Sequence, residues 1–405
     1  MLKLDLIQTV AFAGVVLFIG YGIRRIIPFL TRYNIPAPVV GGLLISVIIL
    51  FARQYEVTLF QFDTTLQSPL MIAFFTSIGF GASYARLKVG GPQVILFFIL
   101  VSIVALMQNL VGIALAIPLG MHPLFGVIVG SLTLAGGPAT GLAFAPQFEQ
   151  AGVAGATTLI VASAILGIVV AGLAGGPVAT FLIERCHLAV VRVQSSAIIA
   201  ATNVDSIESA TEKLAGENNS AFFFIKNLVI ILIAMWIGGW ISNGLTTMHI
   251  TLPAYIGAMI VAAIIRNLDD VAKAVNLSPR VIDDIGNAAL SLAIVMALMT
   301  LKLWELAGLA LPLLVILVVQ VAVIAAISFW PVFKMMGRDY ESAVIVGGFC
   351  GFMLGITANA VANMSTLVER YGPAPRAFLV VPMVAAFFID FPNALIITAC
   401  LNIWK

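Results

Sequence analysis

Long apolar runs separated by short polar stretches dominate the chain. A helix needs about 20 apolar residues to cross a bilayer, and fewer where protein buries its ends. The runs predict ten membrane-spanning helices, at 6–23, 38–52, 69–84, 93–117, 157–183, 222–243, 252–266, 286–304, 307–331 and 376–403. Arg24 and Arg25 follow the first run directly, without a small-residue cleavage site. We therefore expect a retained span there, not a signal peptide.

Two further apolar segments, 124–148 and 342–368, are interrupted near their centres by Gly, Pro, Thr or Asn. About a dozen residues precede each break, and a dozen helical residues extend about 18 Å, roughly half of a bilayer. We expect each segment to enter the membrane, turn at mid-depth and return to the same side as a re-entrant hairpin. The alternative is an ordinary glycine-rich helix that packs closely through its small residues.

A long polar segment, 185–221, divides the chain into similar halves, 1–184 and 222–405. The halves match at a nearly constant offset of 217 to 220 residues. The matches include Ile35-Pro36-Ala37 with Leu252-Pro253-Ala254, Pro92 with Pro312, Gly130 with Gly348, and Gly137 with Gly355. We predict two repeats of five spans each. Because five is odd, the second copy enters the membrane inverted, as in many secondary transporters.

The distribution of basic residues predicts the orientation. With the N-terminus outside, 16 of the 20 Lys and Arg residues fall on the cytoplasmic side and 4 on the outside. Basic loops prefer the cytoplasm. Both termini should therefore be extracytoplasmic, and the linker 185–221 cytoplasmic.

Composition narrows the class of protein. Hydrophobic residues make up 61% of the chain and charged residues 9%, whereas an ordinary soluble domain carries roughly 25% charged residues. The fold class is therefore an all-α membrane protein solvated by the lipid bilayer. A net charge of +2 gives no indication of nucleic-acid binding, and no protease, hydrolase or ATP-binding motif occurs, so we do not predict an enzyme.

The hairpin tips are candidate binding elements. A helix that starts at mid-membrane offers unpaired N–H groups and a positive dipole end to an anion. Glycines allow the turn and the close approach of a ligand. The candidate substrate-binding residues are Gly136, Gly137, Thr140, Gly141, Gly355, Thr357, Asn359 and Asn363.

Other polar residues lie at membrane depth. Asp390 is an acid well inside a predicted span, where a carboxylate is costly and usually functional. Asp390 could hold Na⁺ together with Asn393, or it could carry a proton by itself. The alternative is that Asp390 makes a structural hydrogen bond. Gln108, Asn109 and Gln320 could line the site or join helices to one another.

Several stretches resemble the bacterial sodium/glutamate symporter family along nearly the whole chain except the linker. They are Ile35-Pro36-Ala37-Pro38 with Gly41-Gly42, Met107-Gln108-Asn109, Ala297-Leu298-Met299 with 301–307, and 378–383 through Phe388-Ile389-Asp390. The resemblance implies Na⁺-coupled uptake of L-glutamate by a homodimer in the bacterial inner membrane. It also implies a mobile domain that carries both re-entrant loops against a scaffold, as in elevator-type alternating access.

The two tips depart in part from the family's motifs. In the Gly-Gly-His-Gly-Thr-Gly loop, Gly136, Gly137, Thr140 and Gly141 match, whereas Pro138 and Ala139 replace His and Gly. In the second loop, Gly355, Thr357, Ala362, Asn363 and Met364 match, whereas Ala358 and Asn359 replace Pro and Thr. Another carboxylate, such as a dicarboxylate or keto acid taken up with Na⁺ or H⁺, therefore remains an alternative substrate. A channel is a further alternative.

Overall fold

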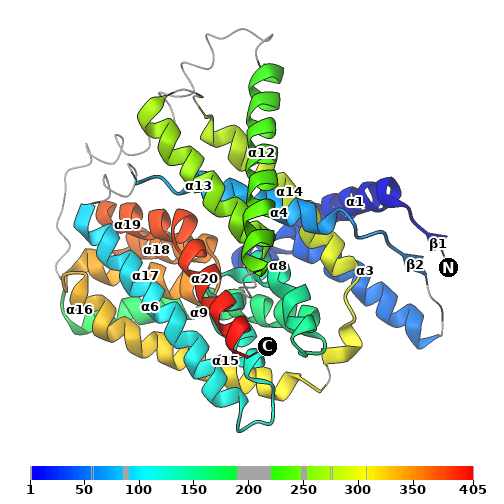
Figure 1. The fold of residues 1–405 in the computed structure, drawn as a ribbon. Helices are drawn as coiled ribbons and strands as arrows, with labels where there is room; N and C mark the ends of the chain where they lie inside the picture. The colour runs from blue at the N-terminus through cyan, green and yellow to red at the C-terminus, as the bar shows by residue number, and fades with distance from the viewer. Residues whose placement is uncertain are drawn as a thin grey trace.

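The fold is described from a computed structural model that covers residues 2–55, 57, 59–84, 91–188, 220–247, 253–273, 275, 277–306 and 308–404. Apart from two short parallel strands, β1 (Leu2–Lys3) and β2 (Phe60–Gln61), its regular elements are helices. Figure 1 shows them as one bundle, with the N-terminal strand at one edge. The predicted linker 185–221 lies almost entirely outside the described residues.

Short start and stop signals fix the helix bounds. Asp5 and Gln8 form a capping box at the start of α1. Proline occupies the first turn of α3, α14 and α19, where its missing N–H costs nothing. The helices of the first half are α1 (Leu6–Ile26), α2 (Pro28–Arg32), α3 (Ala37–Gln54), α4 (Gln67–Gly81), α6 (Gly91–Ala116), α7 (Pro123–Val127), the π-helical turn η1 (Ile128–Leu132), α8 (Gly137–Gln150) and α9 (Ala156–Arg185).

The second half, 222–405, also contains long helices and shorter, interrupted ones. Its elements are α12 (Ser220–Thr247), α13 (Ala254–Ala272), α14 (Pro279–Met299), the short turn η3 (Leu303–Leu306), α15 (Ala310–Ile327), the π-helical turn η4 (Ser328–Val332), α16 (Phe333–Met335), α17 (Tyr340–Met353), α18 (Thr357–Tyr371), α19 (Pro375–Phe387) and α20 (Asp390–Ile403).

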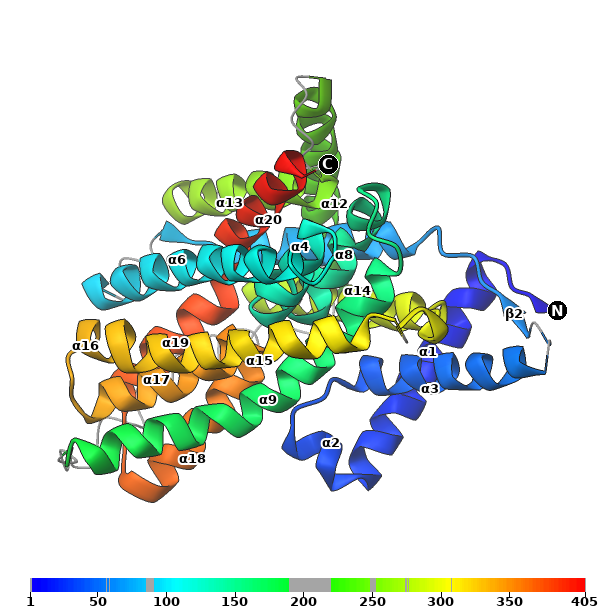
Figure 2. The ribbon, with the colours of Figure 1, turned by 90° about the horizontal axis from the view of Figure 1, so that it is seen from below.

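The long helices form two groups. In the first group, α1, α3, α4, α12, α13 and α14 pack against one another. In the second group, α6 to α9 pack with α15 and α17 to α20. The groups touch chiefly where α8, α19 and α20 meet α4, α13 and α14. Figure 2 shows α6, α15 and α9 of the second group running in similar directions, with α1, α2 and α3 to one side.

Glycines bring helices of the first group into backbone contact. A β-carbon built on Gly42 would lie 2.4 Å from Leu298 Cβ, and one built on Gly79 would lie 2.3 Å from the Met259 carbonyl oxygen. Gly20 lies equally close to Ala37. Small residues of this kind allow helices to pack closely in a bilayer, where lipid offers no hydrophobic driving force between them. The side chain of Ser46 extends the contact by donating to the Leu298 carbonyl oxygen.

Each predicted span corresponds to helix, but not all helices are long and apolar enough to cross a bilayer alone. In the part of the chain that the structure describes, seven are, or eight if the bent pair α19 and α20 is one span. Two of the ten predicted spans are not among these eight. Helix α4 has only 15 residues, and α13 carries Arg266, Asp269 and Asp270 in its last turns. The count of ten crossings therefore stays a prediction.

Several predicted boundaries differ from those observed; for example, α13 extends to Ala272, beyond the predicted end at 266. The span expected at 286–304 is α14, which begins at Pro279 and ends at Met299. The charges of Asp283 and Asp284 lower the hydropathy of its first turns, so the apolar pattern did not include them. Proline is nevertheless favoured in the first turn of a helix, where Pro279 lies. The span at 376–403 is not continuous, because α19 and α20 meet at 41° just before Asp390. The span expected to end at 331 extends through η4, which is kinked at Trp330, and α16 to Met335.

Both predicted interruptions are present. The first broken segment consists of α7, η1 and α8, with a kink at Gly130 inside η1 and its break at 135–136. The second consists of α17 and α18, which pack against each other and are joined by residues 354–356. Each break therefore lies at or beside the glycine-containing tip that the sequence indicated.

Candidate functional site

The tips of the two broken segments meet. Gly137 has φ +67°, which favours glycine, and it begins α8. A β-carbon built there would lie 3.1 Å from Ile356 Cγ2 and 3.9 Å from the Gly355 carbonyl oxygen. The two tips, which are more than 200 residues apart in sequence, therefore lie side by side, as expected for two tips that form one site.

Two helix N-termini begin at this place. Helix α8 starts at Gly137 after Gly136, and α18 starts at Thr357 after Ile356; neither helix has a side-chain cap. The first N–H groups of a helix have no partner within the helix. Such groups and the dipole favour an anion. The arrangement can therefore offer backbone donors to a carboxylate from two directions.

The threonines and small residues lie at or near the tips. The Thr357 hydroxyl donates to the Ala385 carbonyl oxygen of α19 at 3.1 Å. Thr140 is 2% exposed and packs on Gly136, so close that a β-carbon on Gly136 would lie 2.6 Å from Thr140 Cβ. Gly141 packs on Ile160, and Gly355 on Ala171. The glycines therefore set how closely the tips and α9 approach.

Two predicted binding residues point to a neighbouring helix. Asn359 Nδ2 donates to the Ile168 carbonyl oxygen at 3.0 Å, and Asn363 Nδ2 donates to that of Ala171 at 3.1 Å. Both side chains are buried. They therefore join α18 to α9, although Asn359 Oδ1 has no partner among the described residues.

Asn109 and Asn393 converge on Ser131, a residue that the sequence reasoning missed. The Ser131 amide donates to Asn109 Oδ1 at 2.9 Å, and Asn393 Nδ2 donates to the Ser131 carbonyl oxygen at 3.1 Å. Ser131 lies in η1 directly after Gly130, whose non-helical backbone (φ −101°, ψ −137°) kinks the helix and interrupts its regular hydrogen bonding. A serine inside the apolar run 124–148 was the signal that could have revealed it.

Gln108 and Gln320 belong to a second polar cluster. Gln108 Nε2 donates to the carbonyl oxygen of Met353, the last residue of α17, at 2.8 Å. Gln320 Nε2 donates to the Gln108 carbonyl oxygen at 2.6 Å. Gln108 and Asn109 therefore link α6 to both broken segments and to α15.

Asp390 is the first residue of α20, directly after the bend. An acid in the first turn interacts favourably with the positive end of the helix dipole. Asn393, one turn further along the same face, reaches Ser131. The bend therefore places an acidic residue one turn before Asn393, whose amide contacts the first broken segment.

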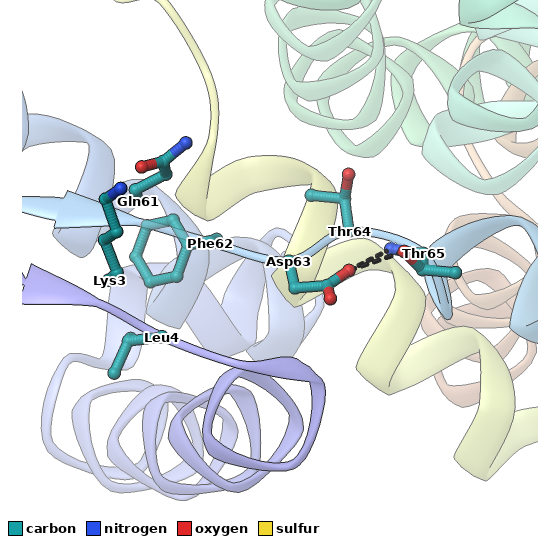
Figure 3. A pocket seen from close by; sticks show the side chains of 7 residues that line it. All are labelled: Lys3, Leu4, Gln61, Phe62, Asp63, Thr64 and Thr65. Atoms are coloured by element: carbon teal, nitrogen blue, oxygen red, sulfur yellow. Dashed lines mark hydrogen bonds between the residues drawn. The ribbon is translucent and has the colours of Figure 1, made fainter.

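A separate pocket lies outside this region. Figure 3 shows Lys3, Leu4, Gln61, Phe62, Asp63, Thr64 and Thr65 around it, beside the two short strands. Hydrogen bonds from the Thr65 hydroxyl and backbone amide lower the pKa of Asp63 below its ordinary value. None of the predicted site residues lines this pocket.

The chain matches a model of the sodium/glutamate symporter family over residues 2–373. It is 38% identical over 389 residues to a sodium/glutamate symporter of Haemophilus influenzae, covering 96% of this chain and 95% of the relative. It is 39% identical over 399 residues to a sodium/glutamate symporter of Escherichia coli, covering 98% of this chain and 97% of the relative. Matches of this extent leave no large segment of either protein unaccounted for. The chain belongs to the sodium/glutamate symporter family.

Proposed function

We propose that this protein is a sodium-coupled symporter that takes up L-glutamate. Family membership supports the reaction, and one structural observation carries the assignment of the site: two uncapped helix N-termini meet at Gly137 and Ile356. The two carboxylates of glutamate would accept from the first N–H groups of α8 and α18. The hydroxyls of Thr140 and Thr357 would orient the solute.

The proposed architecture is ten crossings in two inverted repeats, 1–184 and 222–405. Related contacts recur at the offset found in the sequence. Gly20 packs on Ala37 and Gly41, and Gly238 packs on Gly257 and Ala258. Gly42 of α3 contacts Leu298 of α14, and Gly79 of α4 contacts Met259 of α13. At the repeat offset, α3 corresponds to α13 and α4 to α14, so the second contact is the counterpart of the first.

The broken segments add a further related pair. Asn109 accepts from the amide of Ser131, and Ser328 contacts Cys350 with 3.0 Å between hydroxyl and thiol. Adding 219 to 109 and to 131 gives 328 and 350. In both halves, the helix before the broken segment therefore contacts it at an equivalent depth.

In the proposed mechanism, the second group of helices carries the tips and moves against the first. The limited contact between the groups suits such a motion. The first group would form the scaffold and the homodimer contact in a bacterial inner membrane, with both termini outside. Cation binding at Asp390 and Asn393 would offset the charge of the solute, so each ligand favours the other by reciprocal linkage.

A different carboxylate is the second candidate substrate. Pro138, Ala139, Ala358 and Asn359 replace the family's usual tip residues. The proline directly follows Gly137 and lacks an N–H group, which removes one possible donor from the first turn of α8. A dicarboxylate or keto acid could suit a tip with fewer donors.

Transport in proteoliposomes tests the reaction. An inward Na⁺ gradient should drive accumulation of labelled glutamate about tenfold or more above an equal K⁺ gradient, because the cation and solute bind cooperatively. A competition panel of aspartate, dicarboxylates and keto acids, repeated with a pH gradient, checks the alternative. Flux that depends on a keto acid and on protons, without response to Na⁺ or glutamate, would reject the proposal.

Side-specific labelling tests the re-entrant segments. In a variant whose three cysteines are replaced, Leu119→Cys and Gln150→Cys should both react with an impermeant maleimide from outside. Lys334→Cys and Glu369→Cys should both react from the cytoplasmic side. Reaction of the two ends of one segment from opposite sides would show that this segment crosses the membrane.

Thr357→Val tests the second tip. Loss of a hydroxyl that contacts the solute should raise the KM for glutamate about fivefold, which corresponds to about 1 kcal/mol for one hydrogen bond. Thr366→Val on the same helix is the control, because its exposed hydroxyl donates within α18. If the tip hydroxyl is only structural, Thr357→Val will lower the maximal rate and leave KM unchanged.

Asp390→Asn tests the cation site. The change keeps the size of the side chain and removes its charge, so the Na⁺ concentration for half-maximal uptake should rise about tenfold, the effect of about 1.4 kcal/mol. Glutamate affinity at saturating Na⁺ should change little. Asp63→Asn, in the pocket beside the two strands, is the control. A Na⁺ response equal to that of the unmodified protein would remove Asp390 from the site.

A further inference from the structure

Two buried carboxamide oxygens lie inside the second group of helices without a partner. They are Oε1 of Gln108 on α6 and Oε1 of Gln320 on α15; both side chains are 0% exposed. Neither oxygen has a hydrogen-bond donor among the described residues. A buried acceptor left unmatched costs about 1–3 kcal/mol, so each of these two oxygens requires either a hydrogen-bond donor or a cation.

The hydrogen bonds determine which atom of each carboxamide is the nitrogen and which is the unpartnered oxygen. Gln108 Nε2 donates to the Met353 carbonyl oxygen at 2.8 Å, and Gln320 Nε2 donates to the Gln108 carbonyl oxygen at 2.6 Å. Exchanging oxygen and nitrogen in either side chain would place two acceptors against each other. Both oxygens therefore remain unpartnered acceptors, and each carboxamide already uses its amino group on a carbonyl.

The neighbouring cluster around Ser131 differs in this respect. There, Asn109 Nδ2 is an unpartnered donor, Asn393 Oδ1 is an unpartnered acceptor, and the Ser131 hydroxyl can act as either. The cluster of Gln108 and Gln320 offers acceptors only, a set that can coordinate a cation and that a single water could meet only by donating both of its hydrogens.

The position of the cluster adds an electrostatic argument. Met353 is the last residue of α17, and the C-terminal end of a helix carries partial negative charge. Half-helix ends and unwound carbonyl groups commonly coordinate the coupling cation of secondary transporters. No carboxylate hydrogen-bonds to Gln108, Gln320 or Met353 in the described chain, which disfavours the divalent cations that prefer carboxylates.

We infer that Gln108 and Gln320, with carbonyl groups at the C-terminal end of α17, form a Na⁺ site distinct from Asp390. The inference rests on the proposed Na⁺-coupled transport and deepens it. The ion would hold the end of α17 against α6 and α15. Because residues 354–356 follow directly and lead into α18, Na⁺ bound here would order the second tip before the solute arrives.

The test measures thermal stabilisation of the purified protein by NaCl, with choline chloride keeping the ionic strength constant. A ligand that binds the folded state raises stability in proportion to the logarithm of its concentration over Kd. Gln108→Met and Gln320→Met preserve side-chain length and remove the oxygens. Asn227→Leu is the matched control, because this buried carboxamide has both ends paired, with Phe223 and Ser278.

The unmodified protein should show a Na⁺-dependent rise in Tm. Each Gln variant should need at least about threefold more Na⁺ for the half-maximal effect on Tm and on uptake. Asn227→Leu should lower Tm at every Na⁺ concentration without changing the half-maximal concentration. If the half-maximal Na⁺ concentration rises less than threefold in both Gln variants, as expected if the cluster holds only water, the inference is overturned. If the unmodified protein shows no Na⁺-driven flux of any solute, the proposed function fails as well; normal flux with unchanged Gln variants defeats the inference alone.

Discussion

Backbone groups inside a bilayer must find partners within the protein, and the broken segments meet this requirement with carboxamides from neighbouring helices. In the π-helical turn, the amide and carbonyl of Ser131 bind Asn109 and Asn393. At the end of α17, the Met353 carbonyl oxygen accepts from Gln108. Irregular backbone at membrane depth is tolerated only when it is buried in protein or lines a wet cavity. These amides therefore allow the helices to stop where a solute could bind.

The same amides hold the two broken segments in one body. Helix α6 contributes Gln108 to the second segment and Asn109 to the first. Helix α9 supports α18 through Asn359 and Asn363. A tip that moved alone would leave several buried polar groups unpaired, each at a cost of about 1–3 kcal/mol. Motion of the whole second group of helices is therefore cheaper than motion of one tip.

The polar side chains that join the tips to neighbouring helices are carboxamides and hydroxyls, which are neutral. Helix dipoles supply partial charge of either sign at helix ends, so N-termini suit an anion and C-termini suit a cation. The tips gather two helix N-termini, whereas Gln108 donates to the carbonyl oxygen at the C-terminal end of α17. The second group of helices thus contains helix ends of both polarities, as the proposed anion and cation sites require.

The sequence by itself determined the class of protein, the helices and the positions of the breaks. Apolar runs must be helical in lipid, and Gly137 and Gly355 lie beside interruptions that the run lengths already indicated. The bend before Asp390 and the true start of α14 at Pro279 were not evident, because hydropathy does not report helix direction or the burial of acids.

Only the tertiary structure decided which polar residues meet. Gln108, Asn109, Asn359 and Asn363 look alike as isolated polar positions in apolar helices, but two reach carbonyls of α9 and two reach the broken segments. Ser131 is identified as part of the polar region because its carbonyl oxygen accepts from Asn393, which is 262 residues away in the sequence. A hydrogen bond depends on the relative rotation and depth of two helices, and the pattern along one helix fixes neither.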